Sequence, residues 1–369
     1  MRIGVLTSSR ADYGIYLPLL KALSLDDYFT LEIIAFGTHL SKRHGYTIDY
    51  ILEDGFNVKY QIETTPEGDN AFDISHSMAI TSNKFAYFWE DNKNNFDIVF
   101  CLGDRYEMFS AVSVSIPFNI KLAHLHGGEK TLGAIDNFFR HSITLASRLH
   151  FVSCKAHSDR VAKLTESEEN IFDVGSLSLD NIKSLVFLSI NEFFDRFKVD
   201  LSLPTILLTV HPETVSPEKN AGYVDELVKS LLALKSYQVL ITLPNADTSS
   251  SIIRNRFLQL PEETDSRISC HENLGTQGYF TAMKFCLFLL GNTSSGIIEA
   301  ASLQKWVINL GDRQKGRQQS NNIINSPFEH QSIIGAVKKI EQDLVYRGEN
   351  IYFKGNAAQT ICSVIKKHK

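Results

Sequence analysis

The sequence predicts an α/β protein made of two Rossmann-like domains, each with a doubly wound parallel sheet, that face each other across a cleft. Short apolar runs alternate with amphipathic helical segments, and this alternation restarts near residue 205. Alternating strands and helices are typical of a parallel sheet covered by helices on both faces. Every polar cluster directly follows one of the apolar runs. Ligands of such sheets bind beyond the carboxyl ends of the strands, so two sheets with polar carboxyl ends predict a cleft.

Each predicted strand is a short apolar run bounded by turn residues. In the first half of the chain these runs are Ile3–Leu6, Leu31–Phe36, Asn57–Ile62, Ile98–Leu102, Leu122–Leu125, Leu149–Val152 and Ile171–Val174. In the second half they are Thr205–Thr209, Gln238–Thr242, Arg267–Cys270, Leu287–Leu290 and Trp306–Leu310. Apolar residues at helical spacing predict helices at Ile135–Ala146, Tyr223–Leu234, Ile297–Leu303, Ile333–Leu344 and Ala357–Lys367.

The chain has 369 residues, which is too long for one small core. We expect an N-terminal domain at residues 1–180 that carries acid–base residues and a C-terminal domain at 181–355 that binds a nucleotide. The mixed segment Asn181–Ser202 is interpreted as the crossing between them. Residues 356–369 are expected to form a last helix that packs back on the first domain.

Composition narrows the possible partners. With 37 basic and 42 acidic residues the net charge is −5, which gives no electrostatic reason to expect nucleic acid or a membrane surface. Met1–Leu6 reads as a strand rather than a signal peptide, and no segment approaches the roughly 18 apolar residues of a spanning helix, so we expect a cytoplasmic protein. Five cysteines without a C-x-x-C pair favour reduced, mostly buried thiols.

The segment His124-Leu125-His126-Gly127-Gly128-Glu129 gathers proton donors and acceptors at a predicted strand-to-helix junction. The period of a strand predicts that His124 and His126 lie on the same face and share one environment. Asp136 falls in the first turn of the helix that follows. Any one of these residues alone is explained as well by a turn or a helix cap, but together they indicate chemistry.

Two kinds of chemistry fit this cluster. His124 and His126 with Glu129 offer the donors of a divalent metal site. Asp104, Glu129 and Asp136 with His126 suit general acid–base catalysis, which needs groups on opposite faces of a reacting carbon. We favour acid–base catalysis and expect no metal.

The turn Gly291-Asn292-Thr293-Ser294-Ser295-Gly296 leads into a predicted helix and indicates an anion site, because helix N-termini attract phosphate. Simple capping by Ser294 or Ser295 explains the turn about as well. Glu299, one turn further along, could accept from a ribose diol, so the two parts together fit a nucleoside diphosphate. The chain lacks a Gly-x-Gly-x-x-Gly after its first strand and a Walker lysine motif, which disfavours nicotinamide and P-loop chemistry.

Three arginines, Arg10, Arg105 and Arg313, lie in loops expected near the cleft. A guanidinium binds phosphate oxygens bidentately, although each of these residues alone could be a surface ion pair. His211, directly before Pro212, is a further candidate as a phosphate donor because it follows a strand.

These motifs resemble, in the same order, those of the hydrolysing UDP-N-acetylglucosamine 2-epimerases of sialic acid biosynthesis, which include bacterial capsule enzymes and the epimerase half of the animal bifunctional enzyme. The likeness covers nearly the whole chain. It rests on Thr7–Gly14, Gly103–Glu107, His124–Glu129, Asp136 with Arg140-His141, His211–Thr214, Gly291–Gly296 with Glu299, and Gly311–Gln314.

The resemblance implies a fold of the glycosyltransferase-B type, a homodimer or homotetramer, and no redox cofactor. The implied reaction is an anti elimination of UDP through 2-acetamidoglucal, followed by addition of water to give N-acetylmannosamine. The implied UDP contacts are Arg10, Arg105, His211, Asn245, the backbone of Leu274, Thr293, Ser294, Glu299 and Arg313.

The chain departs from the family pattern at His126, where many members carry a glutamate, and has one extra residue between Glu129 and Asp136. The capsule-type branch shares the histidine. We expect Asp104 and Asp136 to flank the sugar, His126 to exchange the proton and Glu129 to orient these groups. Whether His126 or Glu129 carries the proton stays open here.

Three other functions remain open at this point. The same reaction on a diacetylated bacillosamine nucleotide would feed legionaminic acid. A glycosyltransferase on the same scaffold would also bind UDP. A non-catalytic sensor would bind a UDP-sugar without turnover.

Overall fold

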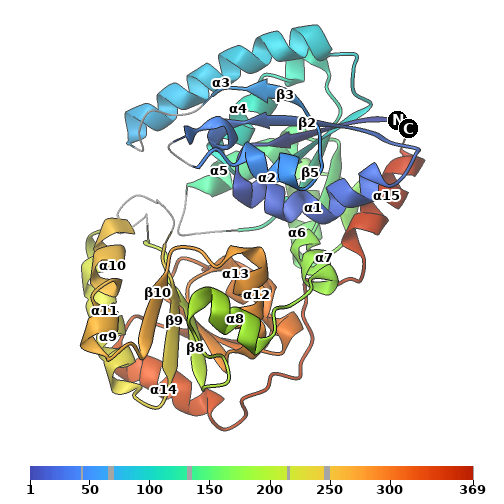
Figure 1. The fold of residues 1–369 in the computed structure, drawn as a ribbon. Coiled ribbons are helices and arrows are strands. Elements are labelled where there is room, and N and C mark those ends of the chain that lie inside the picture. The colour runs from blue at the N-terminus through green and yellow to red at the C-terminus, as the bar shows by residue number, and fades with distance from the viewer. Residues whose placement is uncertain (43–44, 65–69, 131–134, 214–216, 245–249, 369) are drawn as a thin grey trace. The chain divides into compact units, whose positions relative to one another are not determined.

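The computed structural model describes residues 1–42, 45–64, 70–130, 135–213, 217–244 and 250–368. The chain forms two compact units (Figure 1). The first unit comprises Met1–Glu129, Ile135–Asn181 and Tyr352–Lys369, and the second contains Ile182–Ile351.

The first unit is built on a seven-stranded parallel sheet of order β3-β2-β1-β4-β5-β6-β7. Strand β4 is buried along its whole length, as expected for a parallel strand covered on both faces. The strands are β1 (Arg2–Thr7), β2 (Thr30–Phe36), β3 (Val58–Ile62), β4 (Ile98–Leu102), β5 (Leu122–Leu125), β6 (Leu149–Val152) and β7 (Ile171–Asp173).

Helices cover both faces of this sheet. A core on one face includes residues of α1 (Arg10–Ser24), α2 (Ile48–Glu53) and α15 (Ala357–Lys367), and α15 packs against α1. The core on the other face includes residues of α3 (Ala71–Asn92), α4 (Tyr106–Ser113) and α5 (Asp136–Ala146). Helix α6 (Lys155–Thr165) contacts β6 and β7, and α7 (Leu177–Ser184) spans the sequence boundary between the units.

The second unit has a six-stranded parallel sheet of order β10-β9-β8-β11-β12-β13. Its strands are β8 (Thr205–Thr209), β9 (Gln238–Thr242), β10 (Ile268–His271), β11 (Phe288–Gly291), β12 (Trp306–Leu310) and β13 (Ile323–Ser326). One core includes residues of α9 (Asn220–Ala233), α10 (Ser250–Phe257), α11 (Leu260–Glu263) and α14 (His330–Ile340). The other includes residues of α8 (Ile190–Phe197) and α12 (Gly275–Phe285).

The strand orders confirm the prediction of two doubly wound sheets. In each sheet the first three strands are added in one direction, and the later strands are added on the opposite side of the first strand. The strand order therefore reverses between β1 and β4 and between β8 and β11. Such a reversal leaves a crevice beyond the carboxyl ends of the two strands, where ligands of this fold bind. Asp104 and Asn292 follow β4 and β11 at these points.

Two predicted features of the second unit differ from the structure. Strand β13 was not predicted, because its short run Ile323-Ile324 is followed directly by Asn325 and Ser326. The helix predicted at Ile297–Leu303 instead begins at Ser294, ends at Ile298 as α13, and continues as a 3₁₀ turn over Ala300–Leu303.

Among the described residues, no helix is long and apolar enough to cross a membrane. All five cysteines are free thiols, and only Cys270 is not fully buried.

Candidate active site

Two histidines, His124 in strand β5 and His126 directly after it, lie in different environments. His124 is fully buried, with Nε2 2.9 Å from the carbonyl oxygen of Gly103 and Nδ1 3.1 Å from Thr144 Oγ1. A carbonyl can only accept, so Nε2 is the donor. Burial lowers the pKa of His124 to about 3, which keeps the ring neutral. Since both ring nitrogens have partners in the protein, His124 is a structural link between β5 and the loop after β4 rather than a metal ligand.

His126 does not continue the alternation of the strand. Strand β5 ends at Leu125, and His126 has φ 63°, in the left-handed region that few non-glycine residues adopt. Its Nδ1 lies 2.7 Å from Glu129 Oε1. The expectation that His124 and His126 share one environment is therefore wrong, because the backbone turns at His126 before the period of the strand can place the second ring.

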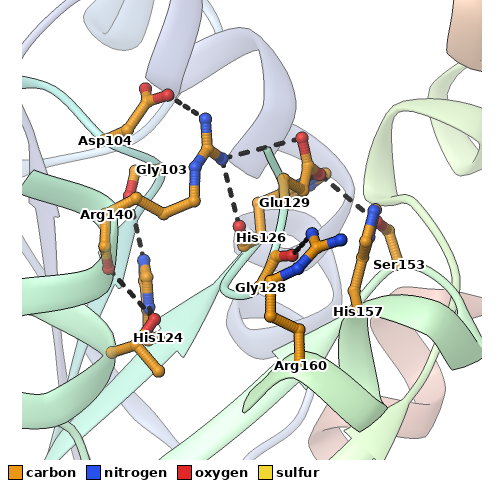
Figure 2. A network of polar contacts seen from close by, with 11 residues as sticks. Gly103, Asp104, His124, His126, Gly128, Glu129, Arg140, Ser153, His157 and Arg160 are labelled. Atoms are coloured by element: carbon orange, nitrogen blue, oxygen red, sulfur yellow. Dashed lines mark hydrogen bonds and ion pairs between the residues drawn. The ribbon is translucent and has the colours of Figure 1, made fainter. Parts of the chain in front are cut away.

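Arg140 of α5 joins the predicted acid–base residues. Its side chain is only 2% exposed, and it forms an ion pair with Asp104 and lies 3.6 Å from Glu129 Oε2. It also donates to the carbonyl oxygen of His126 over 3.2 Å. Figure 2 shows the guanidinium between Asp104 on one side and Glu129 on the other. One buried cation thus holds groups from the ends of β4 and β5.

Asp136 lies in the first turn of α5, as predicted; it is the first helical residue and is half-buried. A carboxylate in the first turn of a helix interacts favourably with the helix dipole. Asp136 and Arg140 are four residues apart, so they lie one turn apart on the same side of α5. The structure therefore brings Asp104, His126 and Glu129 together around Arg140 and places Asp136 on the helix that carries this arginine.

Glu129 is also held from the opposite side. Ser153, which follows β6, donates to Glu129 Oε1 over 3.2 Å and lies 3.0 Å from His157 Nδ1 of α6. Both Ser153 and His157 are buried. Arg140 was named only within the motif Asp136 with Arg140-His141 and was not predicted as a site residue. Ser153 and His157 were not predicted at all, because nothing in the local sequence distinguishes them from ordinary residues at a helix start.

The two arginines of the first unit that were predicted to bind phosphate differ in their surroundings. Arg10 is the first residue of α1 and is exposed. Arg105 makes a two-point ion pair with the buried Glu107, with Nε to Oε2 at 3.2 Å and Nη2 to Oε1 at 2.8 Å. The Glu107 carboxylate also raises the pKa of Arg105 above its ordinary value. Arg105 is therefore oriented by the protein before any ligand arrives.

In the second unit, Asn292 ties the predicted residues His211 and Arg313, and also Gln314, to the end of β11. Its side chain exchanges two hydrogen bonds with the backbone of His211, at 2.8 and 2.9 Å. Its carbonyl oxygen accepts from Arg313 Nη1 at 3.1 Å and from Gln314 Nε2 at 2.8 Å. Asn292 is fully buried and had no assigned role in the sequence, although it stands inside the predicted anion turn.

The anion turn leads into α13, which begins three residues before the predicted helix start. Thr293 caps α13, since its side chain accepts from the backbone N–H of Ser295, and Ser294 is the first helical residue. Glu299 ends the helix and is buried. Leu274, which precedes α12, is buried. Asn245 lies outside the described residues.

Gly291 makes this turn possible. Its φ is 138°, and a Cβ at this position would lie 1.9 Å from the carbonyl oxygen of Thr209. No side chain fits at that distance, so only glycine lets β11 end this close to β8.

Comparisons with known proteins show the family of this chain and support its fold. Residues 21–366 match the family model described as UDP-N-acetylglucosamine 2-epimerase. Polysialic acid biosynthesis protein P7 of Escherichia coli is 35% identical over 99% of this chain and 93% of its own length. The GDP/UDP-N,N'-diacetylbacillosamine 2-epimerase (hydrolyzing) of Campylobacter jejuni is 36% identical over 88% of this chain and 84% of its own.

Among solved structures, the UDP-GlcNAc 2-epimerase from Neisseria meningitidis bound to UDP-GlcNAc has a TM-score of 0.84. The superposition covers 100% of both chains at 16% sequence identity. It confirms the predicted fold of two Rossmann-like domains of the glycosyltransferase-B type.

Proposed function

The chain belongs to the UDP-N-acetylglucosamine 2-epimerase family, and we propose that it catalyses the hydrolysing reaction, in which UDP-N-acetylglucosamine and water give N-acetylmannosamine and UDP. The observation that carries the proposal is the set of contacts of Arg140 with Asp104, Glu129 and the backbone of His126. A buried cation that gathers carboxylates beside an imidazole provides the acids and bases that an epimerisation needs.

The proposed reaction has two stages. In the first, the bond between C1 and the UDP oxygen breaks while a base accepts the C2 proton, which gives 2-acetamidoglucal and UDP. In the second, a water oxygen bonds to C1 and its spare proton passes to a base, while an acid gives a proton to C2 from the other face. The stereocentre changes through a proton and not a hydride, so the reaction needs no redox cofactor.

We assign Asp104 and Asp136 to positions that flank the sugar, and His126 to the exchange of the C2 proton. An imidazole suits this exchange because one ring nitrogen can accept a proton while the other donates a hydrogen bond. Glu129 orients His126, as their 2.7 Å contact supports. Asp104 and Asp136 come from different elements, the end of β4 and the start of α5, which gives the site two separately positioned carboxylates.

We propose that the second unit provides most of the UDP contacts. Asn292 fixes the backbone of His211 and the guanidinium of Arg313, and a guanidinium suits phosphate oxygens. The full proposed set is Arg10, Arg105, His211, Asn245, the backbone of Leu274, Thr293, Ser294, Glu299 and Arg313. We also propose that the enzyme works in the cytoplasm and forms a homodimer or homotetramer. Light scattering of the purified protein tests the oligomeric state.

A second substrate is supported by the Campylobacter relative, which is named for diacetylbacillosamine and is as similar to this chain as the polysialic acid protein. The bacillosamine sugar carries an acetamido group at C4 and lacks the C6 hydroxyl, and the chemistry at C1 and C2 is the same. The same residues would therefore serve either nucleotide.

The test is proton NMR of the purified protein with UDP-N-acetylglucosamine in D2O without any acceptor. We expect UDP and N-acetylmannosamine with deuterium at C2. Asp104→Asn should abolish this signal, and Asp159→Asn, which changes an exposed carboxylate of α6, should leave it unchanged. Turnover of only the bacillosamine nucleotide would select the second substrate, and no turnover of either would refute the proposal.

A further inference from the structure

Four side chains form a continuous hydrogen-bonded chain that ends at His126. His157 Nδ1 lies 3.0 Å from Ser153 Oγ, Ser153 Oγ lies 3.2 Å from Glu129 Oε1, and Glu129 Oε1 lies 2.7 Å from His126 Nδ1. All four residues are less than a tenth exposed. Figure 2 shows that they come from separate parts of the first unit, the loop after β5 and the start of α6.

The chemistry of these groups fixes the direction of every bond. An ionised carboxylate can only accept, so both His126 Nδ1 and Ser153 Oγ must donate to Glu129. The serine hydroxyl has one hydrogen and gives it to the charged acceptor, because charge-assisted hydrogen bonds are the stronger ones. His157 Nδ1 must then carry a proton and donate to Ser153. One carboxylate therefore sets the tautomers of two histidines.

We propose that Ser153 and His157 are positioning residues of the active site. They hold Glu129 so that it accepts the Nδ1 proton of His126, and the Nε2 lone pair of His126 is then the one that takes the proton from C2. In this assignment Glu129 carries no substrate proton. The role of Nε2 rests on the proposed function, whereas the tautomers do not.

The backbone supports this arrangement. Gly128 has φ 75°, and a Cβ there would lie 2.4 Å from the carbonyl oxygen of His157. Glycine at this position lets the loop approach α6 closely enough for Glu129 to reach Ser153. Arg160 of α6 also donates to the carbonyl oxygen of Gly128. The loop is therefore held against α6 by contacts that are independent of the carboxylate.

The tautomers are measured directly by NMR of protein labelled with ¹⁵N-histidine, through the two-bond couplings of the ring nitrogens. The chain has 12 histidines, and the signals of His126 and His157 are assigned from the spectra of His126→Gln and His157→Gln. We expect both rings to carry their proton on Nδ1 in the protein without substrate. An Nε2 proton on either ring would overturn the proposal; the couplings are read on the unsubstituted protein, and the two variants serve only to assign the signals.

Glu129→Gln tests the coupling between the two rings. Arg140 Nη1 faces Oε2 at 3.6 Å, so the single amide oxygen should turn toward this cation and leave the NH2 group facing His126 and Ser153. The NH2 group donates, which forces His126 Nδ1 to accept and makes Ser153 donate to His157 instead. Both rings should then switch together to the Nε2 proton. A switch of His126 alone, or of neither ring, would refute the chain.

Kinetics test the effect on the reaction. Ser153→Ala should lower kcat about tenfold with KM within about twofold, since a hydrogen bond to a charged group contributes about 1.5–3 kcal/mol, which at about 1.4 kcal/mol per tenfold change in rate is about tenfold or more. Ser153→Thr keeps the hydroxyl and should restore most of kcat. The control is Ser115→Ala, which removes a buried hydroxyl that donates to the Val112 carbonyl oxygen and should leave kcat unchanged. Equal kcat values for Ser153→Ala and Ser115→Ala would refute a positioning role.

The proposed function and the hydrogen-bonded chain can be refuted separately. Absence of turnover on either nucleotide sugar would refute the proposed function while the tautomers of the unliganded protein could still agree with the hydrogen-bonded chain. Turnover with an Nε2 proton on His126 would refute the chain and leave the proposed function standing.

Discussion

Replacing Arg140 should destabilise the first unit more than any exposed ion pair can explain. Arg140→Met removes the cation but keeps much of the apolar volume of the side chain. Glu129, only 3% exposed, would then stay buried opposite a thioether, and Asp104, 24% exposed, would lose its ion pair. Loss of one partner of a buried pair costs about 3–5 kcal/mol, because the remaining charge is left uncompensated.

Most of that cost should come from Glu129, since Asp104 reaches solvent and surface pairs contribute only about 0–1 kcal/mol. The donor to the carbonyl oxygen of His126 is lost as well, at about 1 kcal/mol. The summed loss is about 4–6 kcal/mol, so with a urea dependence of about 2 kcal/mol per M the unfolding midpoint should fall by about 2–3 M. Arg140→Lys keeps the charge but not the forked geometry, so its shift should be smaller.

The two tryptophans allow the first unit to be followed alone. Trp89 is fully buried in it and donates to the carbonyl oxygen of Ala111 at 3.0 Å, whereas Trp306 belongs to the second unit. In a Trp306→Phe background, urea unfolding monitored by fluorescence therefore reports on the first unit. The control Lys155→Met removes an exposed pair with Asp159 on α6 and should shift the midpoint by less than about 0.5 M. A shift as small for Arg140→Met would show that Glu129 is not held as a buried anion.

Three further predictions concern stability and the anion turn. Burial lowers the pKa of His124 to about 3 and of His150 to about 4, so below pH 6.5 the unfolded chain binds protons that the folded chain does not. The free energy of unfolding should therefore be at its full value above pH 6.5 and fall by roughly 1–2 kcal/mol per histidine by pH 5. Urea unfolding midpoints measured across this pH range test this. Gly291→Ala should prevent correct closure of the turn and abolish UDP binding by calorimetry, since its Cβ would lie 1.9 Å from the Thr209 carbonyl oxygen. Asn292→Ala removes both hydrogen bonds to the His211 backbone, at about 1 kcal/mol each, and should weaken UDP binding by about tenfold or more, whereas equal affinity would refute its positioning role.

Much of the fold follows from local patterns in the sequence. Strands β4, β5, β6 and β8 are buried along their whole length, and β9 and β12 are buried at all but their first residue. Their apolar runs therefore end sharply at turn residues, and all six strands have the predicted bounds. Edge strand β13 was missed because half of it is polar and only one of its edges is paired. An edge strand that is held mainly by hydrogen bonds to one neighbouring strand has no clear apolar pattern in its own sequence.

The site was harder to predict than the fold. The loops that carry Asp104, His126 and Glu129 were found because their polar residues follow strands, and that position is fixed by the topology. The side to which His126 points was not predicted correctly, because the alternation of a strand ends where the backbone turns to φ 63°. Ser153 could not be predicted for a different reason. It is 24 residues from Glu129 in the sequence and contacts it only because β5 pairs with β6.

Helix α5 explains why these separate loops can act together. Asp136 and Arg140, one turn apart on it, are fixed to each other by the helix rather than by a loop. Arg140 then reaches Asp104 after β4 and Glu129 after β5, so three elements of one sheet-and-helix layer share a single cation. A shift of α5 would therefore move one carboxylate directly and loosen two others. We infer that the spacing Asp-x-x-x-Arg matters as a unit, and that inserting one alanine after Phe138 should abolish C2 exchange even if Asp136 and Arg140 are both retained.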